Sequence, residues 1–418
     1  MSEARSETSP PSLIPAYVSA GVSDHGRRYD LDWIRVIAFF LLILYHVGMF
    51  YVPWDFHVKS PHPVEALEPF MMLTSPWRLT LLFLVSGAAT RFMADKMSVG
   101  GLTRARMARL LPPLLLAMFV IVPPQSYLEV VEKVPEQAQT YGVFWWKYAT
   151  HTGHWCRGDD CLMTPTYNHM WFVLYLLIYS LVLVALLAFA APVLRRLESG
   201  LERGLAGWRL LVLPILFLGA IRAGLVPHFP ITHWPVNDWY NHALSFSAFL
   251  FGFLMARSPV FRQRFIAGRW VALVVAVAAY AGVIGFNWVY RADDAVPPTA
   301  LHLTMRFVYA ADQWAAITAI LGFGARHLTR ENAALRYLTP AVFPFYLVHQ
   351  TVIVILAHYL ARAALPQVLE AAILVAATFA ACFATYEIVR RIDILRPWFG
   401  LKRRVPRPAL AEIRTQAA

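Results

Sequence analysis

The sequence predicts an all-α membrane protein with about ten transmembrane helices and both termini in the cytoplasm. Of its 418 residues, 58% are hydrophobic and only 15% are charged, and the mean hydropathy is +0.51. A soluble domain is typically about 45–50% apolar and about 25% charged. The apolar excess is too large for one or two ordinary cores, so it excludes a soluble enzyme, a disordered scaffold and a disulfide-built secreted domain.

Ten apolar runs are long enough to cross a bilayer, which needs about 20 mostly apolar residues. Residues 1–28 precede them as a polar tail without the apolar core and cleavage site of a signal peptide. The third run contains four prolines, and the eighth carries Arg306 and Asp312. The runs cover roughly residues 33–52, 76–94, 110–128, 169–191, 208–226, 240–257, 269–290, 302–324, 340–361 and 367–389.

The basic residues orient the chain in the membrane. With a cytoplasmic N-terminus, 27 of the 37 Lys and Arg residues fall on the cytoplasmic side, 7 on the opposite side and 3 in or near the spans. Positive charge stays on the cytoplasmic side of membrane proteins, so this split predicts that both termini are inside. A nucleic-acid partner is then not required to explain the net charge of +12, because the basic residues face anionic lipids of the inner leaflet.

This topology divides the chain into a polar cytoplasmic tail (1–28), a membrane domain (29–390) and a basic cytoplasmic tail (391–418). The longest external loop, 129–168, contains Cys156 and Cys161. In an oxidising compartment, a disulfide between them is the simplest interpretation. Free thiols are one alternative, and a metal site that includes nearby His and Asp side chains is another. The spacing matches no strong zinc signature, so we predict no metal here.

Three ionisable residues are predicted to lie near the membrane centre, where such groups are costly and usually functional. His46 follows Arg35 by eleven residues, about three helical turns, so both share one face of the first helix. His349 and Asp312 reach a similar depth in the ninth and eighth helices, which makes a proton-handling cluster possible. The alternatives are a packing role for His46 and a structural partnership of Asp312 with an arginine such as Arg222.

A basic cluster opens the third helix. Arg106 and Arg109 are three residues apart and share a helix face, and Arg104 adds a third positive charge. Guanidinium groups bind phosphate in a bidentate manner, so the cluster suits a phosphate-bearing ligand from the cytoplasm. An ordinary positive-inside anchor is the alternative.

Six short blocks, in the right order, resemble the acyltransferase 3 family of membrane acyltransferases. Arg35 and His46, with ten residues between them, match the family's hallmark, and Arg106 and Arg109 match its Arg-x-x-Arg pair. The blocks span about residues 30–401, which is essentially the whole membrane part. The remaining blocks are L-L-F-L-V-S-G with Ser86, N-H-M-W-F-V-L-Y with His169 and Trp171, F-P-F-Y-L-V-H-Q with His349, and Y-E-I-V-R-R-I-D-I-L-R-P-W-F-G-L.

The resemblance implies a cytoplasmic acyl-CoA donor and an acceptor hydroxyl on the far side of the membrane. The arginine pair would hold the CoA phosphates. His46 would act either as general base on the acceptor hydroxyl or as the carrier of the acyl group. Ser86 is a second possible nucleophile, although a Ser-Gly pair in a helix is more often a close-packing device. No permanently bound cofactor is implied.

The stretch W-D-F-H-V-K-S (54–60) and the ending L-R-P-W-F-G resemble the family branch that modifies periplasmic glucans, whose type member is a succinyl transferase. The expected activity is therefore O-acylation, by succinyl or acetyl groups, of a glucan or surface polysaccharide at the inner membrane. The soluble esterase-like domain of some members is expected to be absent. The helices and outer loops then bind the acceptor, or a separate periplasmic or glycan-synthesis partner handles it.

A protein of a different class remains the alternative function. A proton-coupled secondary transporter would use His46, Asp312 and His349 to couple protons to substrate movement. Transporters of that kind often contain inverted internal repeats, and the sequence shows none. Binding of acyl-CoA to the purified protein would distinguish the two classes.

We predict that a reporter fused to the C-terminus is active only if it is of a type that functions in the cytoplasm. A reporter inserted within 129–168 should be active only if it is of a type that functions outside the cytoplasm. The charge asymmetry of 27 to 7 is the physical reason, because basic flanks resist translocation. Alkaline phosphatase, which needs an oxidising compartment, can be fused after residue 418. Its activity there would contradict the orientation.

Overall fold

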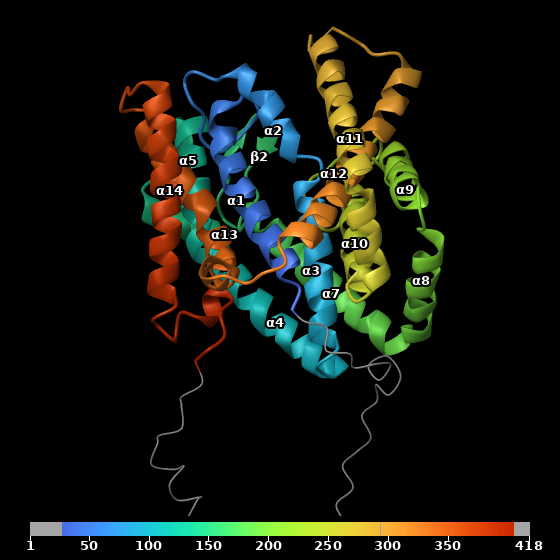
Figure 1. The fold of residues 1–418 in the computed structure, drawn as a ribbon. Coiled ribbons are helices and arrows are strands. Elements are labelled where there is room, and N and C mark those ends of the chain that lie inside the picture. Colours follow the sequence, from blue (N-terminus) through green and yellow to red (C-terminus); the bar gives the residue numbers. More distant parts are fainter. Residues whose placement is uncertain (1–26, 293, 405–418) are drawn as a thin grey trace, which may run out of the picture. The chain divides into compact units, whose positions relative to one another are not determined.

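The computed structural model of the protein describes residues 27–292 and 294–404. The predicted tail over 1–28 therefore lies outside the described residues except for Arg27 and Arg28, and the basic tail over 391–418 is described to residue 404. The described chain is helical apart from one two-stranded hairpin, which agrees with the predicted all-α class (Figure 1). It forms two compact units.

Of the described residues, unit 1 comprises 27–54, 62–106 and 171–339, and unit 2 comprises 55–61, 107–170 and 340–404. The helices α4 (Val99–Leu116) and α13 (Ala333–Leu360) contribute to both. The other helices of unit 1 are α1 (Tyr29–Tyr51), η1 (Glu65–Leu67), α2 (Glu68–Thr74), α3 (Arg78–Ala94), α7 (Trp171–Phe189), α8 (Ala191–Gly204), α9 (Arg209–Leu225), α10 (Trp239–Met255), α11 (Pro259–Val289) and α12 (Thr299–His327).

Unit 2 combines the middle of the chain with its last helices. Its elements are the π-helical turn η2 (Ala117–Ile121), α5 (Pro123–Lys133), η3 (Pro135–Gln137), α6 (Tyr141–Ala149), β1 (Cys156–Arg157), β2 (Asp160–Cys161), η4 (Asn168–Met170), α14 (Gln367–Val389) and η5 (Pro397–Phe399), with most of α13.

The number of helices able to cross a membrane is smaller than the predicted ten. Among the described residues, seven are long and apolar enough, or eight if α8 and α9, bent by 120°, form one span. All ten predicted runs lie in helical structure, but α10 has only 17 residues and α12 carries the buried polar pair Asp312 and Gln313. Ten spans and the orientation of the termini therefore stay predictions.

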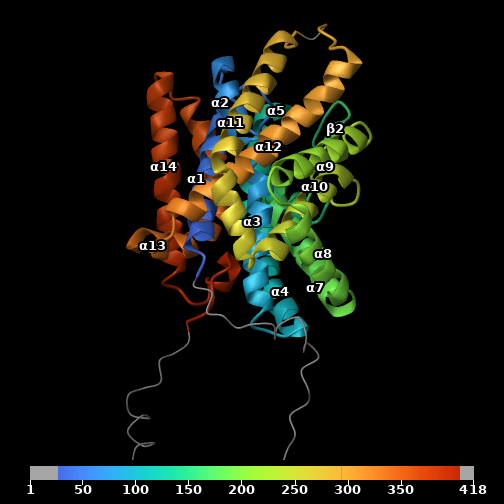
Figure 2. The ribbon, with the colours of Figure 1, turned by 45° about the vertical axis from the view of Figure 1, so that its right-hand side comes forward.

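Unit 1 is held together by close helix pairs. The helices α11 and α12 run side by side as a long pair in both views (Figures 1 and 2). The helices α3 and α10 approach at two glycines: a Cβ on Gly87 would lie 1.8 Å from the carbonyl oxygen of Phe249, and one on Gly252 would lie 1.9 Å from that of Leu84. Only glycine permits such backbone contact, which agrees with the close-packing interpretation of the Ser86–Gly87 pair.

In unit 2 the predicted third span is three segments in succession. The helix α4 passes through Pro112 and Pro113, the turn η2 follows, and α5 restarts with Pro123 and Pro124 in its first turn. Proline is tolerated at the start of α5 because the first N–H groups of a helix have no partner within it. The helix then extends to Lys133, beyond the predicted end of the span at residue 128.

The segment predicted as the external loop, 129–168, contains regular structure. The helix α6 is followed by the hairpin of β1 and β2, in which Cys156 lies opposite Cys161 and forms a disulfide with it. Both sulfurs are therefore committed to each other, which leaves neither as a metal ligand. A small core explains the order of the segment; it consists of Val130, Val134, Phe144, Tyr148 and Trp155.

We expect Gly87→Ala to destabilise the protein by about 1–3 kcal/mol, the usual cost of overpacking, because the added methyl group meets the backbone of α10. Gly100→Ala in α4 is the matched control, since a Cβ there meets nothing within 4 Å. Alanine also favours a helix over glycine, so the control should be neutral or stabilised. Thermal unfolding in detergent measures both. Equal midpoints would contradict the close packing of α3 and α10.

Candidate functional site

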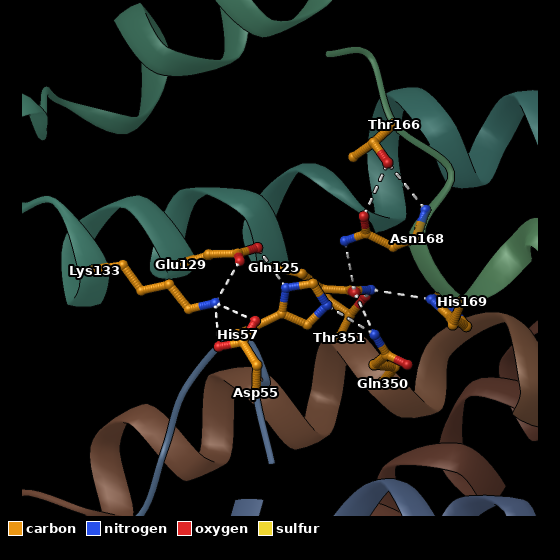
Figure 3. Close-up of polar contacts among 10 residues, drawn as sticks. All are labelled: Asp55, His57, Gln125, Glu129, Lys133, Thr166, Asn168, His169, Gln350 and Thr351. Atoms are coloured by element: carbon orange, nitrogen blue, oxygen red, sulfur yellow. Dashed lines mark hydrogen bonds and ion pairs between the residues drawn. The ribbon is translucent and has the colours of Figure 1, made fainter. Parts of the chain in front are cut away.

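A network of polar side chains lies within unit 2, where the loop 55–61, α5, η4 and α13 come together (Figure 3). Hydrogen bonds and ion pairs link its members into one set, named here the polar network. Polar groups gathered among otherwise apolar helices are costly and mark a functional site. The members are Asp55, His57, Gln125, Glu129, Lys133, Thr166, Asn168, His169, Gln350 and Thr351.

His57 and Glu129 form the charged end of the polar network. The Nδ1 atom of His57 lies 2.6 Å from a carboxylate oxygen of Glu129. The ammonium group of Lys133 lies 3.0 Å from the other carboxylate oxygen and 2.9 Å from the carboxylate of Asp55. A carboxylate can only accept, so Nδ1 of His57 carries the hydrogen and its Nε2 is the acceptor in the neutral ring.

Two glutamines connect His57 to the rest of the network. The amide nitrogen of Gln350 lies 3.0 Å from Nε2 of His57 and donates to the side-chain oxygen of Gln125 at 3.2 Å. Gln125 is fully buried; it donates to the hydroxyl of Thr351 at 2.6 Å and accepts from Asn168 at 3.2 Å. The amides therefore satisfy one another, and each is held in one orientation.

The network ends at His169, which lies beside His349; the sequence singled out both histidines. The amide nitrogen of Gln125 lies 3.4 Å from Nδ1 of His169, whose ring centroid lies 5.2 Å from that of His349 at a right angle. His349 donates from Nδ1 to the carbonyl oxygen of Tyr346 at 2.7 Å. Both histidines are buried. The structure thus brings together His169 and His349, which lie far apart in the sequence.

The hallmark pair Arg35 and His46 lies on α1 in unit 1. A guanidinium nitrogen of Arg35 lies 3.1 Å from a carboxylate oxygen of Asp32, one turn earlier on the same helix. His46 is half-buried. Its ring makes an edge-on contact with that of Tyr45, with centroids 5.9 Å apart.

Asp312 also belongs to unit 1, on α12. It is 3% exposed, and its Oδ2 has no hydrogen-bond partner among the described residues. Arg222, the structural partner considered for it, instead donates to the hydroxyl of Tyr240 at 2.9 Å and lies 3.6 Å above the ring of Tyr309. The predicted cluster of His46, Asp312 and His349 is thus divided between the two units.

The basic residues of α4 differ in exposure. Arg104 is exposed and Arg109 is half-buried, whereas Arg106 is only 5% exposed. The Nε of Arg106 donates to the hydroxyl of Ser180 at 2.9 Å, which fixes its guanidinium group. Arg104 and Arg106 therefore do not form one surface patch, although all three lie within one helical segment.

The two remaining predicted residues pack inside unit 1. Ser86 is half-buried on α3 beside the close contact with α10, and its carbonyl accepts from the hydroxyl of Thr90 at 2.7 Å. Trp171 opens α7 with its ring stacked on that of His233 at 4.2 Å between centroids. Both surroundings are those of packing residues.

Several members of the polar network were not predicted as site residues. Gln125, Glu129 and Lys133 recur every fourth residue, so they share one face of α5, and this polar stripe was the available signal. His57 lies in the W-D-F-H-V-K-S stretch, and Gln350 follows His349 directly. No group of three or more His, Cys, Asp or Glu side chains suited to a metal occurs among the described residues. The arrangement suits proton transfer and hydrogen bonding to hydroxyl groups.

Comparisons with known proteins agree with the resemblance seen in the sequence. The model of the family described as "Acyltransferase domain" matches residues 28–387. Glucans biosynthesis protein C of Salmonella typhimurium is 23% identical over 403 residues, which cover 93% of this chain and 98% of that protein. The protein of the same name from Salmonella schwarzengrund is 23% identical over 77% of this chain and 81% of its own. No solved structure matches.

The protonation of the Lys59 side chain, which lies in the loop that carries His57, should change with pH. Burial lowers the pKa of its ammonium group to about 8, against the opposing effect of Asp55. We expect an amine-reactive reagent to label Lys59 with a midpoint near pH 8, because only the neutral amine reacts. Mass spectrometry of the labelled peptide follows this midpoint.

The same lowered pKa makes the folded protein bind this proton more weakly than the unfolded chain does. The contribution of Lys59 to stability should therefore rise as the pH increases from about 8 towards the ordinary lysine value. Lys59→Arg, which stays charged, is the control for the slope. A labelling midpoint at the ordinary lysine value would contradict the burial of this group.

Proposed function

The chain belongs to the acyltransferase 3 family, and from this premise we propose that it transfers an acyl group from cytoplasmic acyl-CoA to a hydroxyl of an extracytoplasmic glycan. The family match over residues 28–387 carries the proposal. The relatives named for glucan biosynthesis support a glucan or a related surface polysaccharide as the acceptor. The group transferred is succinyl or acetyl.

We assign the donor side to the basic residues of α4. Arg106 and Arg109 hold the phosphates of CoA through bidentate hydrogen bonds, and the exposed Arg104 adds electrostatic attraction. The bond from Arg106 to Ser180 supports this assignment, because it orients one guanidinium group before any ligand arrives. Acyl-CoA is a substrate in this scheme, and no bound cofactor takes part.

We assign the chemistry to His46, with Arg35, His349 and Asp312 as further catalytic candidates. In the overall reaction the acceptor oxygen bonds to the thioester carbonyl carbon, the carbon–sulfur bond breaks, and the hydroxyl proton passes to the thiolate of CoA. His46 either removes that proton or first carries the acyl group itself. His169 and Trp171 are further site residues of the proposal, and Ser86 is the remaining nucleophile candidate.

The proposed setting is the inner membrane, with both ends of a multi-pass chain in the cytoplasm and membrane lipids around it. The glycan is bound by the protein itself or presented by a separate periplasmic or glycan-synthesis partner. Mass spectrometry of surface glycans tests the function: acyl esters should disappear when the gene is deleted and return with the wild-type gene. Unchanged glycan masses would contradict it.

We expect Arg106→Ala and Arg109→Ala each to weaken acyl-CoA binding by roughly tenfold or more, because each removes a bidentate contact to phosphate. Lysine at either position should restore binding only in part, because it lacks the planar fork. Isothermal titration or filter binding with labelled acyl-CoA measures the affinity. Unchanged affinity in the double variant would leave these residues only an anchoring role.

We expect His46→Gln to abolish acyl transfer while protein level and acyl-CoA binding stay near normal. Glutamine keeps a hydrogen-bonding side chain but can neither take up a proton nor carry an acyl group. A general base typically contributes about 10²–10⁴-fold to the rate, so the loss should be at least of that order. Retention of most of the transfer rate would rule out the catalytic role and make His349 the next candidate.

A further inference from the structure

We propose that the polar network of unit 2 binds the acceptor hydroxyl, that His57 removes its proton, and that Glu129 positions His57. This inference rests on the proposed acyl transfer and specifies where the acceptor is activated. Of the two roles proposed for His46, it leaves the carrying of the acyl group, because His57 removes the acceptor proton. Neither His57 nor Glu129 was a predicted site residue.

Hydrogen bonds fix the tautomer of His57. Its Nδ1 donates to Glu129 at 2.6 Å, and Glu129 is held in turn by Lys133 at 3.0 Å. The imidazole is thereby fixed with the lone pair of Nε2 directed away from Glu129. This is the arrangement that a base needs, because the carboxylate both orients the ring and stabilises the imidazolium formed when a proton arrives.

The lone pair on Nε2 of His57 faces amide side chains. Nε2 of His57 meets the amide nitrogen of Gln350 at 3.0 Å, within a group of amides that continues through Gln125 to Asn168. An alcohol O–H can replace the Gln350 N–H as the donor to Nε2. The freed amide and its neighbours then bond to adjacent hydroxyl groups, which suits a polyhydroxylated acceptor such as a glycan.

One end of the polar network is accessible to solvent. His57 lies in the loop between α1 and η1, and its side chain is 16% exposed, as is 21% of that of Glu129. Asp55 beside them is 76% exposed. The amide group is deeper, with Gln125 fully buried and Gln350 only 4% exposed. The polar network therefore extends from a solvent-accessible end to a buried end within unit 2.

A second histidine–glutamate pair shows what is specific to His57. Nδ1 of His358 donates to a carboxylate oxygen of Glu132, three residues after Glu129 on α5, at 2.5 Å. Its other polar neighbour is Arg362, which also contacts Glu132 at 2.8 Å. No amide side chain contacts His358 among the described residues. This pair thus has the same histidine–carboxylate contact but lacks the amide group that would bind a hydroxyl.

In the proposed step, the acceptor hydroxyl loses its proton and gains the acyl group. The acceptor O–H proton passes to Nε2 of His57 while the oxygen bonds to the carbonyl carbon of the acyl group. The bond from that carbon to its leaving group, the CoA sulfur or an acyl carrier on the protein, breaks. The leaving group takes up one proton, and the imidazolium loses one, so His57 returns to its neutral state.

The test uses the full-length protein in lipid nanodiscs, labelled succinyl-CoA or acetyl-CoA, and soluble gluco-oligosaccharides as the acceptor probe. We expect His57→Gln to reduce transfer at least about 10²-fold with unchanged acyl-CoA affinity, and Glu129→Gln to reduce it less. His358→Gln and Glu132→Gln are the matched controls and should keep the wild-type rate. Acyl-CoA affinity and thermal unfolding verify that each variant is folded.

Steady-state kinetics separates a base from a structural role. The charged and titratable groups facing His57 are Glu129 and Lys133 on α5, Asp55 in its own loop and His169 beyond the amides. His57→Gln and Glu129→Gln should lower kcat while the KM for the oligosaccharide stays near the wild-type value, because the base and the carboxylate that positions it act in the transfer step. A merely structural role would raise KM as well.

Chemical rescue provides a second measurement. Added imidazole should restore part of the transfer rate of His57→Ala, whereas it should not help His46→Gln. Equal rates in wild type and His57→Gln, or an effect of Glu129→Gln on KM alone, would overturn this inference while leaving acyl transfer intact. If the wild-type protein bound acyl-CoA but transferred nothing to the oligosaccharides, the proposed function and this inference would both be wrong.

Discussion

Polar groups buried among apolar helices must find partners inside the protein, and this constraint governs the structure of this chain. An unpaired polar group in hydrocarbon costs several kcal/mol. In unit 2, Gln125, Gln350, Asn168 and Thr351 meet it by bonding to one another. The same requirement fixes the ring of His57 through Glu129. A network built to satisfy itself is also rigid, so its donors and acceptors are already in place when a hydroxyl replaces one of them.

The constraint also explains which parts of the fold were predictable from sequence. Long apolar runs must be helical in a membrane, so each predicted run was found in helical structure. The order within 129–168 was not predictable, because its small core pairs Val130 with Phe144 and Trp155 through tertiary contacts that have no local period. The helix α12 is harder to assign as a membrane span, because the polar residues near Asp312 lower the hydropathy of an otherwise apolar run.

The candidate site also has parts that could be predicted from the sequence and parts that could not. His169 and His349 were each recognisable within their sequence blocks, but they lie 180 residues apart, and spacing within one helix cannot reveal such a contact. Gln125 was overlooked because a single amide in an apolar run carries little information alone. Its meaning comes from Glu129 and Lys133 at the same face of α5 and from the side chains of α13 that meet them.

Asp312 differs from Glu129 in both its exposure and its hydrogen bonds. Glu129 is partly exposed and has a hydrogen-bonded partner at each oxygen, so its position is explained by its contacts alone. Asp312 is almost completely buried, and its Oδ2 has no partner among the described residues. Apolar residues of similar volume would pack there at lower cost, since a buried polar group without a partner destabilises the fold. A carboxyl group kept against that cost favours a functional role over a packing one. For Glu129, a functional role is inferred instead from its partner His57, which can remove a proton from the acceptor.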